Sequence, residues 1–337
     1  MDMSKILNNL LENKNLSADE IEYFISNLIN GNINPVQGGA ILTALRMKGE
    51  TVNEITGLIK KIRDVMIPVF TDQAIDVCGT GGDQTGSFNV STATAFVTAG
   101  AGVKVAKHGG RAVSSQSGSS DVMEALGINL KLSNQQAETV LNKAGIVFLF
   151  APLFHPAMKQ VSSIRKELKI RTIFNFLGPF TSPASVKRQL IGVPNIGIAE
   201  KLTKVGKELS YERLLIVTSE DGMDEVSTYS KTTVFEINED LIKKSIIDPK
   251  EFGFKKFDKK AIHGGNATDN SLIIENILNG LKGPQRDIVV FNSAFVLYTA
   301  DIVTDIKEGI KLAEKSIDSG QAKLVLENLI KETQKYE

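Results

Sequence analysis

The feature that most limits the fold is an alternation of short apolar segments with helix-like segments that begins at Ala74. Segments rich in Val, Ile, Leu and Phe, which are typical of buried strands, occupy 75–78, 103–106, 146–150, 190–193, 214–218 and 232–237. Helical apolar patterns fall between most of them, at 90–100, 121–126, 134–144 and 198–209. Strands and helices in this order predict an α/β fold with a mainly parallel sheet.

The first 70 residues instead predict a small all-helical domain. Ser17 and Glu20 have the spacing of a capping box before an apolar helical pattern, and Thr51 and Glu54 repeat this signal. Between them a helix begins at Pro35. The end of the chain predicts helices again, at 270–281, 286–299, 303–318 and 321–331. We therefore expect a helical domain at 1–70 and a larger α/β domain at 71–337.

Composition narrows the function classes. The chain has 337 residues, 42 % of them hydrophobic, which is enough for two domains with a sizeable core. Lys and Arg number 39, as do Asp and Glu, so the bulk charge predicts neither a nucleic-acid nor a membrane partner. The single cysteine excludes an intrachain disulfide and a cysteine-rich zinc site. The start lacks a secretory pattern, and the apolar stretch at 93–106 is too short to cross a bilayer, so we expect a cytoplasmic protein.

A glycine-rich loop, Gly79-Thr80-Gly81-Gly82-Asp83, follows the first predicted strand. Its glycines permit positive φ angles and let backbone amides approach an anion, and the loop leads to a predicted helix start at 89–91. These features predict a cradle for a diphosphate. The loop is not a Walker motif, and Gln84 stands where the dinucleotide-binding pattern needs a small residue. Alone, the motif is equally compatible with an ordinary turn at a sheet edge.

A second polar loop, 107–121, also lies between a predicted strand and a predicted helix. Lys107 and Arg111 supply positive charge, and the serines and glycines around them supply donors with little bulk. This composition suits phosphate oxygens, whereas a flexible polar linker is the simpler alternative.

Two further stretches carry candidate chemistry. Glu220-Asp221-Gly222-Met223-Asp224-Glu225 follows a predicted strand, and its carboxylates are hard ligands suited to Mg²⁺ beside a polyphosphate. Taken alone, it is a solvated acidic turn. Phenylalanines surround His155 and Arg165 in the stretch 150–179 and predict a pocket for a planar anion, although His155 is also compatible with a packed core histidine. We interpret Cys78 and His263 as structural.

These motifs, in this order and across nearly the whole chain, resemble the anthranilate phosphoribosyltransferase family. The resemblance is carried by 79–83, Asn89-Val90-Ser91-Thr92, 107–124, 155–159, 171–179 and 221–227. It implies that a phosphoribosyl group passes from phosphoribosyl pyrophosphate to the amine of anthranilate, with release of pyrophosphate, in tryptophan biosynthesis. It further implies a nucleoside phosphorylase-like fold in which part of 165–185 joins the helical domain, a homodimer formed through that domain, and a glutamine amidotransferase as a further partner.

The resemblance also implies roles for individual residues. Phosphoribosyl pyrophosphate would be held by Gly79, Gly82, Asp83, Ser87, Asn89, Val90, Ser91, Thr92, Lys107, His108, Gly109, Gly110, Arg111, Ala112, Val113, Ser114, Ser115 and Ser119. Anthranilate would be bordered by Gly79, Gly110, His155, Arg165 and Pro179. Ser91, Asp224 and Glu225 would serve two Mg²⁺ ions per subunit, and His108 is the candidate for a catalytic side chain.

One position departs from the family pattern. The family usually has Lys-His-Gly-Asn-Arg, in which the asparagine contacts the acceptor, but this chain has Gly110 at that place. The affinity for the acceptor, or its identity, is therefore open.

Two alternatives remain. A pyrimidine nucleoside phosphorylase has a Lys-x-Ser-Gly-Arg loop, which Gly109-Gly110-Arg111 approaches, but that reaction does not call for Asp224 and Glu225 as magnesium ligands. A non-catalytic relative that binds nucleic acid would need a basic groove, against which the zero net charge argues.

Overall fold

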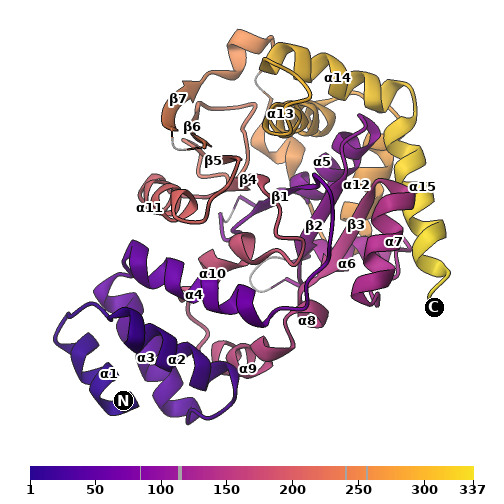
Figure 1. Cartoon of the computed structure of the whole chain (residues 1–337). Helices are drawn as coiled ribbons and strands as arrows, with labels where there is room; N and C mark the ends of the chain where they lie inside the picture. The colour runs from indigo at the N-terminus through magenta and orange to yellow at the C-terminus, as the bar shows by residue number, and fades with distance from the viewer. Residues whose placement is uncertain (84, 113–115, 240, 256) are drawn as a thin grey trace.

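A helical bundle lies beside a larger α/β unit in the computed structural model, which describes residues 1–83, 85–112, 116–239, 241–255 and 257–337 (Figure 1). The bundle begins with α1 (Met3–Leu11), α2 (Ala18–Ile29), α3 (Pro35–Lys48) and α4 (Val52–Val65). Its helices start where the sequence signals predict, because the Ser17 and Thr51 hydroxyls accept hydrogen bonds from the amides of Glu20 and Glu54 in capping boxes. Pro35 occupies the first turn of α3.

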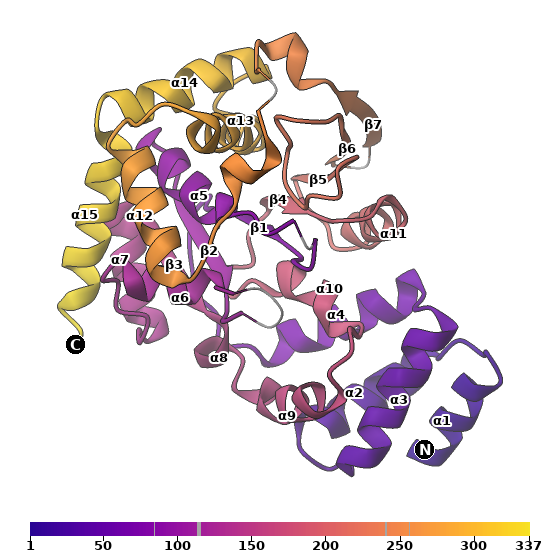
Figure 2. The same cartoon turned by 180° about the vertical axis from the view of Figure 1, so that it is seen from behind.

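The chain returns to this bundle after the third strand. Two short helical segments, α8 (Ala151–Phe154) and η1 (Pro156–Met158), lead into α9 (Lys159–Leu168), which packs against α2 and α3. Next come α10 (Phe174–Leu177) and η2 (Gly178–Thr181), which pack against α4. Figure 2 shows α10 between the N-terminal helices and the sheet, and α9 beside α2 and α3. Segments far apart in the sequence therefore build the bundle together.

The described residues form a seven-stranded sheet in the order β3-β2-β1-β4-β5-β6-β7. Its strands are β1 (Ile75–Gly79), β2 (Val105–Gly109), β3 (Ile146–Phe150), β4 (Arg188–Gly192), β5 (Arg213–Ser219), β6 (Thr232–Asn238) and β7 (Leu241–Ile247). The first five strands pair in parallel, whereas β6 pairs antiparallel with both β5 and β7, which confirms the predicted mainly parallel sheet. Parallel strands place their carboxyl ends on one edge, where the polar loops follow β1, β2 and β5.

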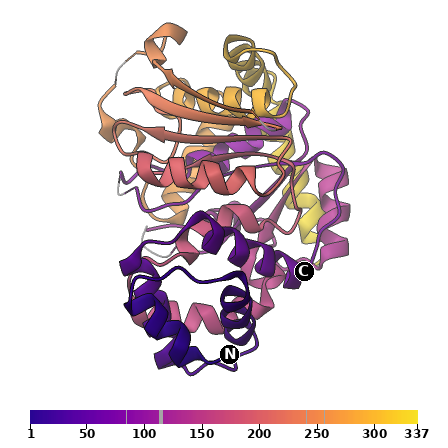
Figure 3. The same cartoon turned by 60° about the vertical axis from the view of Figure 1, so that its left-hand side comes forward.

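Alternate residues along the strands enter two different cores. Leu190 and Leu215 join a core with the helices on one face, whereas Ile191 and Leu214 join a second core with α11 (Ile196–Lys207) and the bundle. The helices of the first face are α5 (Val90–Gly100), α6 (Ser119–Ala125), α7 (Asn134–Ala144), α12 (Ala267–Leu278), α13 (Pro284–Thr299), α14 (Ile306–Asp318) and α15 (Gln321–Gln334). Two short turns, η3 (Pro249–Phe252) and η4 (Lys259–Ile262), lie between β7 and α12. Figure 3 shows α11 between the sheet and the bundle.

Some elements differ from the sequence prediction. Strand β7 was not predicted because it is an edge strand whose apolar residues are exposed and interrupted by Lys243 and Lys244. The last helices begin elsewhere than expected: α14 starts after Asp305, whose side chain accepts from the Glu308 amide, and α12 starts after the capping residue Asn266.

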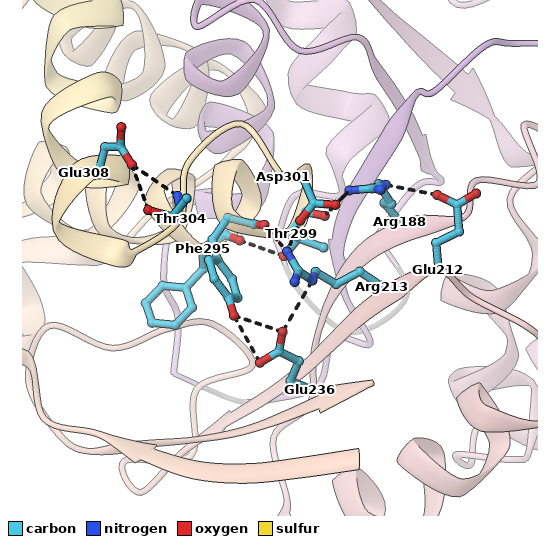
Figure 4. Close-up of polar contacts among 10 residues, drawn as sticks. Arg188, Glu212, Arg213, Glu236, Phe295, Thr299, Asp301, Thr304 and Glu308 are labelled. Atoms are coloured by element: carbon cyan, nitrogen blue, oxygen red, sulfur yellow. Dashed lines mark hydrogen bonds and ion pairs between the residues drawn. The ribbon is translucent and has the colours of Figure 1, made fainter. Parts of the chain in front are cut away.

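An ion-pair network ties the sheet to α13 at the edge away from the polar loops. Arg188 and Arg213, at the starts of β4 and β5, both contact Asp301, and Arg213 also lies 3.4 Å from a Glu236 oxygen (Figure 4). Arg188 pairs with Glu212 at 3.1 Å. The network stabilises the end of the sheet opposite the candidate site. Among the described residues, no helix is long and apolar enough to cross a membrane.

Candidate functional site

The glycine-rich loop after β1 lies over the ends of β4 and β5. Gly81 and Gly82 adopt φ angles of 72° and 75°, in the left-handed region that glycine enters without strain. The Gly81 amide donates a 2.7 Å hydrogen bond to Oδ2 of Asp224, and the Thr80 amide donates to the Gly192 carbonyl at 2.9 Å. The loop predicted to bind an anion and the acidic loop predicted to bind Mg²⁺ are therefore in direct contact.

Asp83, at the end of this loop, forms an acidic cluster with Asp224 and Glu225. The carboxyl groups of Asp224 and Glu225 are buried, and burial raises the pKa of Asp224 to about 7 with a further contribution from the Asp83 charge. Burial, and then the neighbouring Asp224 charge, also raises the pKa of Glu225 well above its usual range. Within the described part of the chain, no three or more His, Cys, Asp or Glu side chains form a group that could hold a metal ion by themselves.

Lys107 brings a buried positive charge to the same cluster. Its side chain is 1 % exposed, and its Nζ donates to the Val77 carbonyl at 2.6 Å and to the Ser91 hydroxyl at 3.2 Å. The Lys107 charge lowers the pKa of Glu225, as does a hydrogen bond from the Ser91 backbone, although burial outweighs both. A lysine is almost never buried unless it is paired, and here it faces the acidic cluster.

Asp76, in β1, is a buried carboxylate that interacts with the Lys107 charge. It was not singled out from the sequence. Burial raises its pKa to about 6 against the opposing Lys107 charge. Its oxygens accept from the His108 amide at 3.3 Å and from Nε2 of Gln189 at 3.1 Å. Gln189 also donates to the Pro179 carbonyl at 2.8 Å and accepts from the Tyr211 hydroxyl at 2.9 Å. The sequence signal that could have identified Asp76 is an acidic residue inside an apolar strand segment.

Two buried histidines face each other where the second polar loop meets the segment around 155. The ring centroids of His108 and His155 lie 5.2 Å apart. Burial lowers the pKa of His108 to about 3 and that of His155 to about 4, so both rings are neutral near pH 7. The Nε2 atom of each ring is buried and has no hydrogen-bond partner among the described residues. Such an orphaned nitrogen inside a protein points to a missing polar partner.

Arg165 approaches this region from α9. Its guanidinium is half-buried, lies 6.0 Å from the Phe174 ring centroid, and has its pKa lowered by burial. Pro179, in η2, is buried in the chain segment that links α10 to β4. The structure thus pairs the Arg165 cation with the Phe174 ring, and the two neutral imidazoles with each other.

Arg111, which supplies positive charge to the second polar loop, is paired with carboxylates in the structure. Its Nη1 lies 2.7 Å from both Asp121 and Glu124, so its charge is already paired in the structure. The Ala112 amide donates to the same Asp121 at 3.2 Å. Gly110 directly follows β2 and has room for a side chain, since a Cβ there would come no closer than 4.0 Å to Ala151.

The remaining predicted donor residues line the edge around this loop. Ser87 pairs with His263 through the backbone in an isolated β-bridge. The Asn89 side chain accepts from Asn270 at 2.9 Å just before α5 begins. Val90 and Thr92 are buried in the first turn of α5, and Ser119 begins α6 beside Gly109. Val113, Ser114 and Ser115 lie outside the described residues.

Comparisons with known proteins agree with one another. Residues 71–323 match the family model described as "Glycosyl transferase family, a/b domain", and residues 4–66 match "Glycosyl transferase family, helical bundle domain". A protein named anthranilate phosphoribosyltransferase from Acetivibrio thermocellus is 46 % identical over 99 % of this chain and 97 % of its own length. One of the same name from Clostridium kluyveri is 45 % identical over 97 % of this chain and 98 % of its own length.

Solved structures match over the same extent. The anthranilate phosphoribosyltransferase of Thermus thermophilus has a TM-score of 0.91 and 33 % identity, over 98 % of this chain and 99 % of that one. The enzyme of Saccharomyces cerevisiae in complex with PRPP and Mg has a TM-score of 0.90 and 31 % identity, over 99 % of this chain and 98 % of that one. Sequence and fold therefore point to one family along nearly the full chain.

Proposed function

This chain belongs to the anthranilate phosphoribosyltransferase family, and we propose from its own geometry how its residues carry out the transfer. The chain is a glycosyltransferase that moves the phosphoribosyl group of phosphoribosyl pyrophosphate to the amine of anthranilate. The observation that supports the site assignment is the convergence of the loop at 79–83, Lys107 and the acidic cluster at one edge of the sheet.

We assign the donor to this edge. Breaking the bond between C1′ and pyrophosphate leaves negative charge on the leaving group, and loop amides aimed at that charge stabilise it without reorganising. Lys107 adds a fixed positive charge held by the Val77 carbonyl and Ser91. The amides of 79–83 and 89–92 and the second polar loop provide the remaining donors.

Asp224, Glu225 and Ser91 fit a magnesium site that the substrate completes. The carboxylates and the hydroxyl are hard oxygen ligands, and Mg²⁺ is commonly held by one or two carboxylates together with substrate phosphates. When bound, Mg²⁺ neutralises the charge of the diphosphate. The protein's part is to hold the Asp224 carboxylate against the Gly81 amide and Glu225 against Ser91. We propose two ions per subunit.

We assign the acceptor to the pocket bordered by Gly79, Gly110, His155, Arg165 and Pro179. The Arg165 guanidinium is suited to pair with a carboxylate, and the Phe174 ring beside it supplies an apolar wall. An aryl amine is already nucleophilic once it is positioned, so a strong base is not required. His108, with its pKa near 3, is a poor base, and we assign its free Nε2 to accept a hydrogen bond. Backbone or water would replace the side chain that Gly110 lacks.

The test is the loss of anthranilate fluorescence with purified protein, phosphoribosyl pyrophosphate and Mg²⁺, repeated with EDTA. Rapid loss that EDTA abolishes is the expected result. Binding of phosphoribosyl pyrophosphate without fluorescence loss would contradict the acceptor assignment and show that Gly110 accompanies a different acceptor.

The helical bundle carries an apolar groove that we propose as the contact with a second copy of the chain. The groove has a volume of about 710 Å³ and lies between α1, α3 and α9. Val36 and Met47, on its rim, are 79 % and 82 % exposed, and clustered apolar exposure of this kind is typical of an interface. The double substitution Val36→Glu with Met47→Glu should give monomers by light scattering at concentrations where the unaltered chain is a dimer.

Three further predictions remain proposals. Residues 1–70 with part of 165–185 are proposed to act as one helical domain, since α9 packs on α2 and α3. A cytoplasmic location is proposed from the sequence, and a glutamine amidotransferase partner is proposed from the resemblance alone. Co-purification of a tagged chain from its native cells tests the partner.

A further inference from the structure

Arg171 connects the bundle side of the molecule to the donor loop. It lies in the linker between α9 and α10, and its guanidinium crosses to the loop after β1. Nη2 donates to the Gly81 carbonyl at 2.5 Å, and Nη1 approaches the Gly82 carbonyl at 3.4 Å. A Cβ added to Gly82 would lie 2.1 Å from Nη2, so the guanidinium occupies the space that a side chain there would need.

These contacts orient the loop's peptide planes. A trans peptide places its carbonyl and its N–H on opposite sides. With the Gly81 and Gly82 carbonyls facing Arg171, the amides of Gly82 and Asp83 face away from it. The Gly81 amide is held from the other direction by Asp224. The loop is thus fixed between an arginine of the linker and a carboxylate of the acidic cluster, with the amides of Gly82 and Asp83 on the face turned away from Arg171.

We propose that Arg171 is a positioning residue that presets the Gly82 and Asp83 amides for the diphosphate of the donor. The inference rests on the proposed assignment of the donor to this edge. A guanidinium is suited to this task because its planar fork reaches two carbonyls at once, which an ammonium does not. The same chain segment carries Arg165, so the contact also ties the loop to the acceptor side.

The experiment compares Arg171→Met and Arg171→Lys with Lys166→Met, a matched control that removes a cation from an exposed position on α9. Calorimetric titration with phosphoribosyl pyrophosphate and Mg²⁺ should show about 10- to 100-fold weaker binding for Arg171→Met, the range expected when charged hydrogen bonds are lost. Arg171→Lys should fall between Arg171→Met and the unaltered chain. The control should remain within about twofold of the unaltered chain.

A second measurement separates positioning from direct contact with the substrate. Amide hydrogen exchange of the loop in the ligand-free protein should become faster in Arg171→Met, with unchanged exchange in β1 below Gly79. A side chain that only touched the bound donor would leave this exchange unaltered.

Unaltered exchange, or unaltered donor affinity, overturns the proposal. The exchange experiment needs no substrate. It therefore tests whether Arg171 holds the loop in place even if the unaltered chain fails to bind phosphoribosyl pyrophosphate. That failure would instead contradict the proposed donor site.

Discussion

The sharpest test of the acidic cluster is the substitution Gly79→Ala. Gly79 ends β1 without a positive φ, so alanine meets no backbone strain there. A Cβ at Gly79 would lie 2.2 Å from Oδ2 and 2.8 Å from Cγ of Asp224, whereas ordinary contact begins at 3.4 Å. The Asp224 carboxylate must therefore retreat by about 1 Å, which breaks its 2.7 Å bond from the Gly81 amide.

The expected loss follows from this displacement. A misplacement of about 1 Å in a positioning group costs roughly 100-fold in rate, and a lost charged hydrogen bond costs about 1.5–3 kcal/mol. We expect kcat/KM to fall roughly 100-fold in the fluorescence assay, with a higher Mg²⁺ concentration needed for half-maximal rate. Gly197→Ala, in the first turn of α11, is the control because its Cβ meets only the end of the Asn195 side chain.

Two results would refute the reasoning. Gly79→Ala with the activity and Mg²⁺ dependence of the unaltered chain would show that the position of Asp224 does not matter. Equal losses in both variants would show that alanine, rather than the displaced carboxylate, is responsible. Urea unfolding of both variants checks that they are folded.

Other side chains of the site give further predictions. Arg165→Ala should raise the anthranilate KM far more than that of phosphoribosyl pyrophosphate, and equal effects would contradict its assignment. Asp76→Asn should lower the free energy of unfolding by about 1–3 kcal/mol in urea, because one buried acceptor facing Gln189 is lost. The pKa values of His108 and His155, lowered to about 3 and 4, mean that the unfolded chain binds more protons below pH 6.5. Their contribution to stability should therefore be complete above pH 6.5 and lost progressively as the pH falls to about 3, and Tm should fall less over this range when both are glutamine.

The sequence predicted the parts of the fold that rest on local patterns. Capping boxes gave the starts of α2 and α4, and apolar segments gave the parallel strands. Strand β7 was missed because it is an edge strand with lysines at its centre. It has no buried face, so its sequence lacks the alternation of apolar and polar residues that predicts a strand.

The site was only partly accessible to sequence reasoning. The contact between the 79–83 loop and Asp224 follows from parallel strands ending at one edge, which the alternation predicts. The pairing of Arg111 with Asp121 and Glu124, and the bonds from Arg171 to Gly81, depend on how distant segments pack. Patterns of neighbouring residues in the sequence do not predict such contacts.

The order of the strands has a consequence for how the chain is assembled during synthesis. Ile75 of β1 pairs on one side with Val105 but on the other with Arg188, so the centre of the sheet stays open until β4 has emerged. At roughly 5–20 residues per second, that interval is of the order of 6 to 20 s. The first four helices likewise share a core with α9, so the apolar surface that α9 covers stays exposed on the ribosome until α9 has been synthesised. A nascent chain stalled between these points should bind chaperones, and one released beyond β5 should not.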